Sequence, residues 1–116
     1  MSYRVARLSQ ANDDLDALFD FLLESYLHFD DDLEAAVERA SQRVARIKAD
    51  LRALGKTPHQ GTLLPHLMPG LRNVTKDRAI FYFTVDDDAQ LVRVLAVFFG
   101  GQEHQRAMLK RLASGR

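Results

Sequence analysis

Five side chains in the second half of the chain can act on an anionic partner. Three are cations, Arg72, Lys76 and Arg78, whose charges can hold a phosphate or a carboxylate. The other two, Tyr82 and His104, can donate hydrogen bonds, and the imidazole can also accept or release a proton near neutral pH. A sheet surface that carries these cationic side chains would suit an anionic or acidic partner. Each of these residues also has a structural interpretation, as a solvated charge, a sheet residue or a surface histidine.

Nothing in the sequence indicates a metal or another cofactor. His59 and His66 have no carboxylate or third ligand at metal-binding spacing. The absence of cysteine excludes disulfides, thiolate metal ligands and a cysteine nucleophile, and it fits a cytoplasmic protein. The N-terminus has no apolar signal core, and no apolar run reaches the ~18 residues that a membrane span needs. We therefore predict a soluble cytoplasmic protein with no membrane partner.

The formal net charge is zero, but charge is unevenly distributed along the chain. Residues 1–38 contain ten Asp or Glu and two Arg, whereas residues 39–84 contain nine Lys or Arg and two Asp. These charges either solvate helix faces or form a basic surface for nucleic acid or an acidic peptide. With 116 residues, the chain is predicted to form one domain over residues 1–116.

Four segments are rich in β-branched and aromatic residues and are predicted to be strands, at residues 3–8, 71–75, 78–85 and 91–99. The first is predicted to be an edge strand. Three aspartates at residues 86–88 mark a turn, so the last three strands are expected to form an antiparallel meander. Strict alternation would divide the last strand into one face with Val92, Val94, Ala96 and Phe98 and another with Arg93, Leu95, Val97 and Phe99.

Two amphipathic helices are predicted between the first strand and the meander. Apolar residues recur at helical spacing over residues 15–26 and again over residues 33–54, which indicates an antiparallel helical hairpin. Asn12 is the predicted N-cap of the first helix, an aspartate of residues 30–32 can cap the second, and Gly55 ends it. The polar face of the second helix is predicted to face solvent and carries Glu34, Glu38, Arg39, Arg43, Arg46 and Lys48.

The segment of residues 55–70 contains all three prolines and is predicted to be a loop. It is either a packed Ω-like loop or a contact surface, and its apolar residues Leu63, Leu64, Leu67 and Met68 favour packing. A short basic helix follows the last strand. One interpretation of its Arg106, Lys110 and Arg111 is that they are no more than favourable charges near a helix C-terminus. The predicted fold class is α+β.

This order of elements resembles the RelE/ParE superfamily, the toxins of type II toxin–antitoxin modules, over almost the whole chain. Four pieces carry the resemblance. Residues 14–21, with the sequence DLDALFDF, match the first helix, and residues 70–72 match the start of the second strand. Residues 78–83 are similar to a strand that combines an arginine with a downstream tyrosine. Residues 94–101 match the strand that usually ends in Leu-His-Gly or Tyr-His-Gly.

The resemblance implies a growth-inhibiting toxin that a cognate antitoxin neutralises, with operator DNA bound only through the antitoxin. Some members of the family cleave messenger RNA in the ribosome, whereas the ParE branch poisons DNA gyrase. If this chain is a nuclease, the resemblance and the chemistry of RNA cleavage imply Arg72, Lys76, Arg78 and His104 as catalytic residues.

One departure from the nuclease pattern favours the ParE branch. The last strand ends at Phe99, where nucleases often have a histidine or tyrosine, and phenylalanine cannot transfer a proton. We therefore expect a gyrase poison, with a ribosome-dependent nuclease and a degenerate toxin as alternatives. The antitoxin is expected to cover apolar surface on the helical hairpin with an amphipathic helix or an extended segment. The residues predicted to bind the target or the antitoxin are Arg72, Arg78, Tyr82, Arg93, Phe99 and Arg106.

Overall fold

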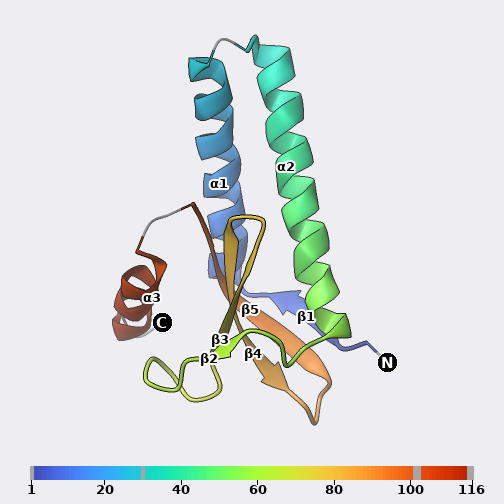
Figure 1. Cartoon of the computed structure of the whole chain (residues 1–116), viewed down its shortest axis with the longest axis vertical. Helices are drawn as coiled ribbons and strands as arrows, with labels where there is room; N and C mark the ends of the chain where they lie inside the picture. Colours follow the sequence, from blue (N-terminus) through green and yellow to red (C-terminus); the bar gives the residue numbers. More distant parts are fainter. Residues whose placement is uncertain (1, 30, 101–102, 115–116) are drawn as a thin grey trace.

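The computed structural model describes residues 2–29, 31–100 and 103–114. It has the predicted α+β architecture, in which a helical hairpin packs on one face of a small sheet and a third helix lies on the other side (Figure 1). The elements are β1 (Arg4–Arg7), α1 (Ser9–His28), α2 (Leu33–Ala53), the 3₁₀ turn η1 (Leu54–Lys56), β2 (Thr62–Leu63), β3 (Arg72–Lys76), β4 (Ala79–Asp86), β5 (Leu91–Phe99) and α3 (His104–Ala113). Each helix in this part of the chain is too short or too polar to span a lipid bilayer.

The sheet has the strand order β1-β5-β4-β3-β2. Its centre is the predicted antiparallel meander of β3, β4 and β5. As expected, β1 is an edge strand, but it pairs in parallel with β5, a direction that the residue pattern did not predict. The opposite edge is β2, two residues that pair with β3 inside the segment predicted to be a loop. The loop prediction was therefore wrong at these two residues, because backbone pairing with β3 needs no strand-like sequence.

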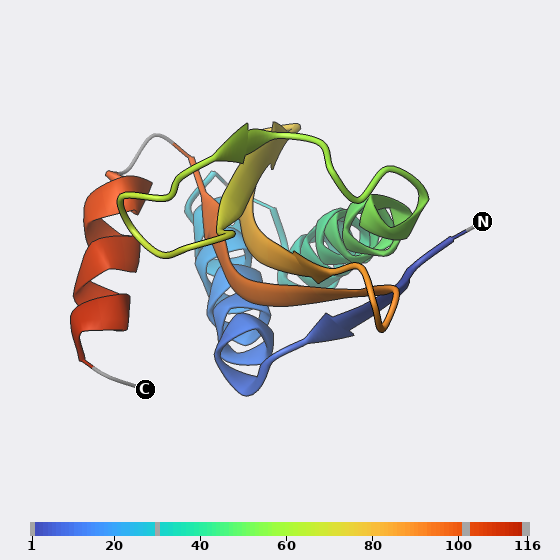
Figure 2. The same cartoon turned by 90° about the horizontal axis from the view of Figure 1, so that it is seen from below.

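Both faces of the sheet are apolar, and each has its own core. The helix-side core lies between the sheet and the α1–α2 hairpin, and its fully buried large residues include Leu51, Leu54, Phe81 and Phe83. The α3-side core lies on the other face, where the loop after β2 runs beside α3 (Figure 2). Its buried residues are Leu64, Leu71, Ile80, Tyr82, Ala96, Phe98 and Met108. This loop is therefore packed, as its apolar residues indicated.

A β-bulge in β5 changes which residues face the helices. Tyr82 pairs with Ala96 but Phe83 pairs with Val94, so Leu95 has no partner on β4. One extra residue shifts the alternation by one position. The predicted faces are therefore correct up to Leu95 and exchanged for the four residues from Ala96 to Phe99. Val97 joins the helix-side core, and Phe99 packs against that core.

The helix boundaries confirm one predicted cap and correct another. The Asp32 carboxylate accepts a hydrogen bond from the Ala35 amide at 2.8 Å and caps α2, as predicted. Asn12 is not a cap, because α1 begins three residues earlier at Ser9 and has Leu8 at its N-cap. Leu8 donates its amide to the Val94 carbonyl, so the pairing of β1 with β5 leads directly into the helix.

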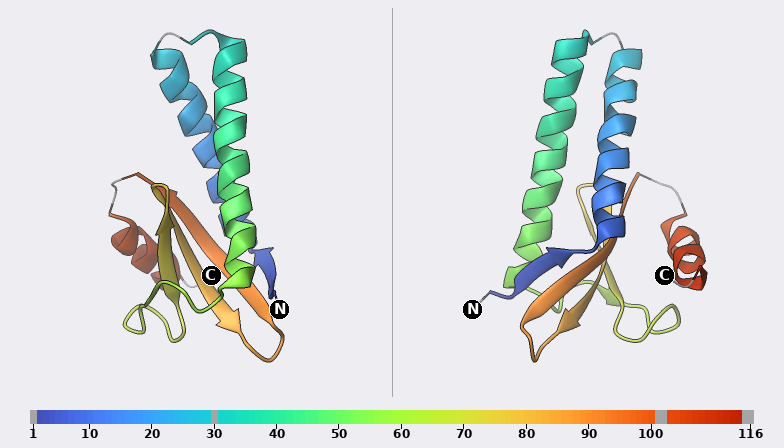
Figure 3. Two further views of the ribbon diagram at one scale, coloured as in Figure 1. Left: turned by 45° about the vertical axis from the view of Figure 1, so that its right-hand side comes forward. Right: turned by 180° about the vertical axis from the view of Figure 1, so that it is seen from behind.

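The distal part of the α1–α2 hairpin extends beyond the sheet (Figures 1 and 3). No third layer covers it among the described residues, so the predicted apolar stripe of α2 becomes exposed at its start. Leu33 is 63% exposed and Val37 is 38% exposed, and Phe29 at the end of α1 is 75% exposed. We call Leu27, Phe29, Leu33 and Val37 the distal hairpin residues.

Candidate functional site

The predicted site residues occupy separate regions of the sheet. Arg72 is the first residue of β3, whereas Arg78 lies in the turn after Lys76, the last residue of the same strand. Because a strand rises ~3.3 Å per residue, about 13 Å of strand separates the two ends. Tyr82 and His104 form a third region, on the α3 side of the sheet. The cations implied for RNA cleavage therefore do not converge on one point.

The β3–β4 turn forms the centre of one cluster. Arg78 was predicted to begin β4, but it is the second residue of a two-residue turn, because Asp77 and Arg78 both have positive φ angles, 51° and 73°. Lys76 and Ala79 pair across this turn, and Ala79 pairs in turn with Phe99. The sheet therefore brings Lys76, Arg78 and Phe99 together, as three of the predicted residues.

Arg43 of α2 completes this turn cluster, and sequence reasoning missed it. Its guanidinium donates a hydrogen bond to the Asp77 carboxylate at 2.9 Å and another to the Asp77 carbonyl. The guanidinium carbons of Arg43 and Arg78 lie 5.1 and 5.4 Å from the centre of the Phe99 ring, within the range of cation–π contacts. The Arg43 side chain is only 14% exposed. Arg43 belongs to the charged face of α2, so the sequence predicted that it faces solvent. The β3–β4 turn packs against this position and covers most of the side chain.

Tyr82 and His104 form a hydrogen-bonded pair. The tyrosine hydroxyl lies 2.7 Å from His104 Nδ1, and burial raises the pKa of Tyr82. When the hydroxyl donates, the imidazole is neutral and carries its proton on Nε2. Tyr82 is fully buried and so presents no surface to a partner, whereas His104 is partly exposed at the start of α3.

Arg72 holds the loop before β2. Its guanidinium donates to the backbone carbonyls of His59 at 2.7 Å and Gln60 at 3.4 Å. Beside it, the Asp87 carboxylate accepts a hydrogen bond from the Tyr3 hydroxyl and lies 2.8 Å from His59 Nε2. The Tyr3 hydroxyl, followed by His59 and the charge of Arg72, lowers the pKa of Asp87. Arg72 thus belongs to a contact between the N-terminus, the loop and the β4–β5 turn.

The other two predicted cations lie in exposed surface pairs. Arg93 lies 3.6 Å from the Asp86 carboxylate, and Arg106 lies 3.5 Å from the carboxylate of Glu103, three residues before it. Exposed pairs of this kind contribute ~0 to 1 kcal/mol to stability, so both arginines are available to a partner at little cost.

Arg111 has a structural role that the sequence did not reveal. Its guanidinium binds both oxygens of Asp14, at 2.8 and 3.0 Å, and one of these oxygens also accepts the Val97 amide. The carboxylate raises the pKa of Arg111. The interpretation of Arg111 as only a surface charge is therefore wrong, because α3 folds back onto α1 and β5.

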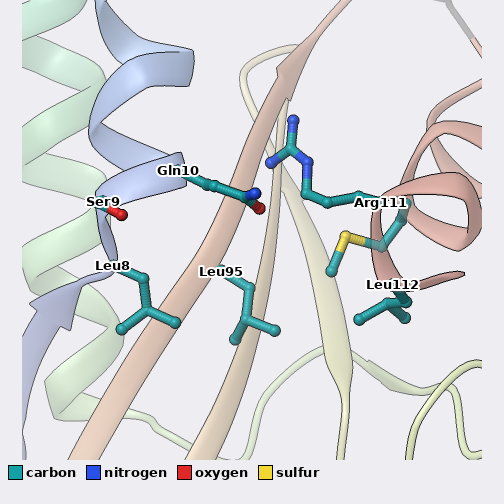
Figure 4. Close-up of a pocket in the computed structure, with 7 residues that line it drawn as sticks. Leu8, Ser9, Gln10, Leu95, Arg111 and Leu112 are labelled. Carbon is teal, nitrogen blue, oxygen red and sulfur yellow. The ribbon is translucent and has the colours of Figure 1, made fainter. Parts of the chain in front are cut away.

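A cavity of about 300 Å³ lies beside this ion pair, between the start of α1, β5 and α3. Figure 4 shows the apolar side chains of Leu8, Leu95 and Leu112 around it, with Arg111 on the same side as α3. A second groove of about 310 Å³ runs between α1 and the end of β5, where Phe21 and Phe99 line it. Both spaces are largely apolar and border elements that also carry the predicted site residues.

Comparisons with known proteins identify the fold. No protein-family model matches the sequence, and no curated protein is significantly similar to it. The structure is similar to a chain of the toxin–antitoxin complex RelBE2 from Mycobacterium tuberculosis, with a TM-score of 0.64 and 15% identity, over 88% of this chain and 95% of that chain. It is also similar to a chain of the chromosomal ParDE system from P. aeruginosa, with a TM-score of 0.65 and 20% identity, over 86% of this chain and 98% of that chain. The chain therefore has the fold of the RelE/ParE toxins.

Proposed function

We propose that this protein is the toxin of a type II toxin–antitoxin module, which inhibits growth in the cytoplasm unless a cognate antitoxin binds it. The observation that carries the proposal is the shared fold, which covers most of this chain and nearly all of both compared chains. The compared structures come from toxin–antitoxin systems.

The exposed apolar surface supports an antitoxin partner. The distal hairpin residues include two large side chains more than 60% exposed, Phe29 and Leu33. Large exposed apolar surfaces of this kind usually mark sites of contact with another protein. An amphipathic antitoxin segment would cover these residues and pair its acidic side chains with Arg78 at the turn cluster. Operator DNA would be bound by the antitoxin.

Growth is the direct test of the proposal. Induced expression of the protein alone is expected to stop growth, and co-expression of the product of the neighbouring gene is expected to restore it. Normal growth at high expression without that product would reject toxicity. Binding of the product by a non-toxic protein would then indicate a degenerate toxin that only partners an antitoxin.

The arrangement of the site supports DNA gyrase as the target. Phe99 ends β5 and cannot transfer protons, and Arg72 is held by loop carbonyls at the far end of β3 from Arg78. A protein that acts by binding needs no convergence of acid, base and cation, whereas RNA cleavage does. Purified protein is expected to inhibit supercoiling by gyrase and to trap a cleaved DNA complex. Unchanged supercoiling at excess protein would exclude this target.

A ribosome-dependent messenger RNA endonuclease is the second candidate. It is supported by the Tyr82–His104 hydrogen bond at 2.7 Å, which would hold the imidazole in one orientation beside the sheet. Lys76 and Arg78 lie in the turn cluster, so RNA would have to span both regions for these cations to stabilise its phosphate. Mapping of messenger RNA 5′ ends after induction distinguishes the two targets, because new ends inside translated codons are expected only from the nuclease.

A further inference from the structure

The β3–β4 turn has an unusual sequence for its backbone conformation. Two-residue turns with two positive φ angles favour Asn-Gly or Asp-Gly, because glycine has no Cβ to strain. Here the second position is Arg78, with φ at 73°. A bulky residue in this region is strained, and it persists where the surroundings hold it. The turn therefore needs contacts from outside its own hairpin.

Arg43 supplies these contacts from α2. It binds both the carboxylate and the backbone carbonyl of Asp77, so it holds the main chain of the turn as well as a side chain. The Arg43 side chain is 14% exposed, compared with 55% for Arg39 one turn earlier in the same helix. Although the Asp77 side chain is 65% exposed, the two hydrogen bonds from Arg43 restrict it more than a single ion pair would, because one of them holds the main chain.

Phe99 transmits the same restraint to the Arg78 side chain. The ring is held opposite Ala79 by sheet pairing and lies under both guanidinium groups. The Gly100 amide donates to the Arg78 carbonyl at 3.0 Å, which holds the backbone of Arg78 against the end of β5. Among the described residues, no carboxylate pairs with Arg78, so its charge is oriented by the ring and remains available.

We propose that Arg43 is a positioning residue, which holds the β3–β4 turn through Asp77 and Phe99 so that Arg78 is presented to the target in one orientation. This inference rests on the proposed function, in which Arg78 contacts the target. It assigns to Phe99 a supporting role for two cations in place of proton transfer. Arg43 acts through Arg78 and does not itself have to touch the target.

A double-mutant cycle on growth inhibition tests the coupling. The measured quantity is the expression level that halves the growth rate. Arg43→Ala and Arg78→Ala are each expected to raise this expression level about tenfold. The double variant is also expected to raise it about tenfold, because both changes remove the contact between Arg78 and the target. Arg43→Lys is expected to restore little, since an ammonium cannot make the paired hydrogen bonds. Effects that multiply to about a hundredfold would overturn the proposal, because a merely destabilising change adds to the loss of Arg78.

Hydrogen exchange at the Gly100 amide tests the geometry without reference to toxicity. Exchange in the full-length protein is expected to quicken several-fold in Arg43→Ala and in Asp77→Asn. It should not change in the control Arg46→Ala, which removes an exposed arginine of the same helix. Asn tolerates positive φ, so Asp77→Asn removes the carboxylate without straining the turn. Unchanged exchange in both variants would refute a role for Arg43 at the turn.

The two experiments separate failure of the inference from failure of the proposed function. If the wild-type protein does not inhibit growth, the proposed function fails, and the exchange rates alone decide whether Arg43 holds the turn. If the protein is toxic but the single and double variants combine multiplicatively, the proposed function stands and the positioning role is rejected.

Discussion

Single residues on this sheet have roles that their type alone does not indicate. The sequence resemblance made Phe99 a departure from a nuclease pattern, whereas in the structure its ring supports the cations of Arg43 and Arg78. Arg72 is a cation that the sequence offered for catalysis, and it holds loop carbonyls. In both cases the groups that surround the side chain in the folded protein decide its role.

The hydrogen bonds of Asp87 predict a pH-dependent stability. Its pKa is lower in the folded protein than the ordinary value of 3.8, first because the Tyr3 hydroxyl donates to it. The carboxylate therefore stabilises the fold above pH 3.8, and this contribution disappears as the pH falls below that value. Wild type is expected to unfold at a higher temperature than Asp87→Ala at neutral pH, and the difference is expected to shrink in acid. Melting curves at several pH values measure it.

The neighbouring residue provides the control for this prediction. Asp88→Ala removes an exposed carboxylate from the same turn, which makes neither of the Asp87 hydrogen bonds, and serves as the matched variant. The same hydrogen bond raises the pKa of Tyr3, so its stabilisation is present below pH 10.0 and is lost at higher pH. A difference between wild type and Asp87→Ala that stayed constant from neutral pH to strong acid would contradict this explanation.

At the level of elements, α3 is attached through few contacts. Among the described residues of α3, Met108 is fully buried. The Arg111–Asp14 ion pair connects this helix to α1 and β5. The bulge at Leu95 makes this connection possible, because it turns the Val97 amide toward Asp14. One inserted residue in a strand thus decides where a separate helix docks.

Removal of the Arg111 guanidinium is expected to destabilise the protein by about 2 kcal/mol, because it leaves the Asp14 carboxylate without its charged partner. The side chains are 23% and 15% exposed, so solvent replaces the pair poorly. Urea unfolding of Arg111→Ala measures the loss. The matched control is Lys110→Ala, an exposed neighbour expected to change stability by less than ~0.5 kcal/mol. Equal stability of the two variants would show that the ion pair does not hold α3.

At the level of the whole molecule, the α1–α2 hairpin is longer than the sheet that covers it. The overhang exposes the distal hairpin residues although they continue the apolar stripe of α2 and the end of α1 (Figure 3). A two-layer domain buries apolar residues only where both layers are present. The distal hairpin residues therefore form an exposed apolar surface to which a partner can bind.

Truncation of Leu33 is expected to weaken antitoxin binding about tenfold without loss of fold stability, since the side chain is 63% exposed in the free protein. Calorimetric titration of Leu33→Ala with the antitoxin measures the affinity, and melting curves measure the stability. Leu63→Ala is the control, because Leu63 is 51% exposed but lies on β2, away from the hairpin. Equal affinities for Leu33→Ala and wild type would place the antitoxin elsewhere.

Local sequence by itself determined the α+β class, the order of elements and the antiparallel meander, because hydrophobic periodicity, turn residues and caps act over a few neighbouring positions. Tertiary structure alone decided the parallel direction of β1, the bulge at Leu95, the packing of Arg43 against the β3–β4 turn and the Arg111–Asp14 pair. Each of these joins segments far apart in the chain, so no local pattern records it. The turn cluster is the clearest example: Phe99 and Arg78 were visible in the sequence as separate candidates, but only packing of α2 against the turn placed them with Arg43.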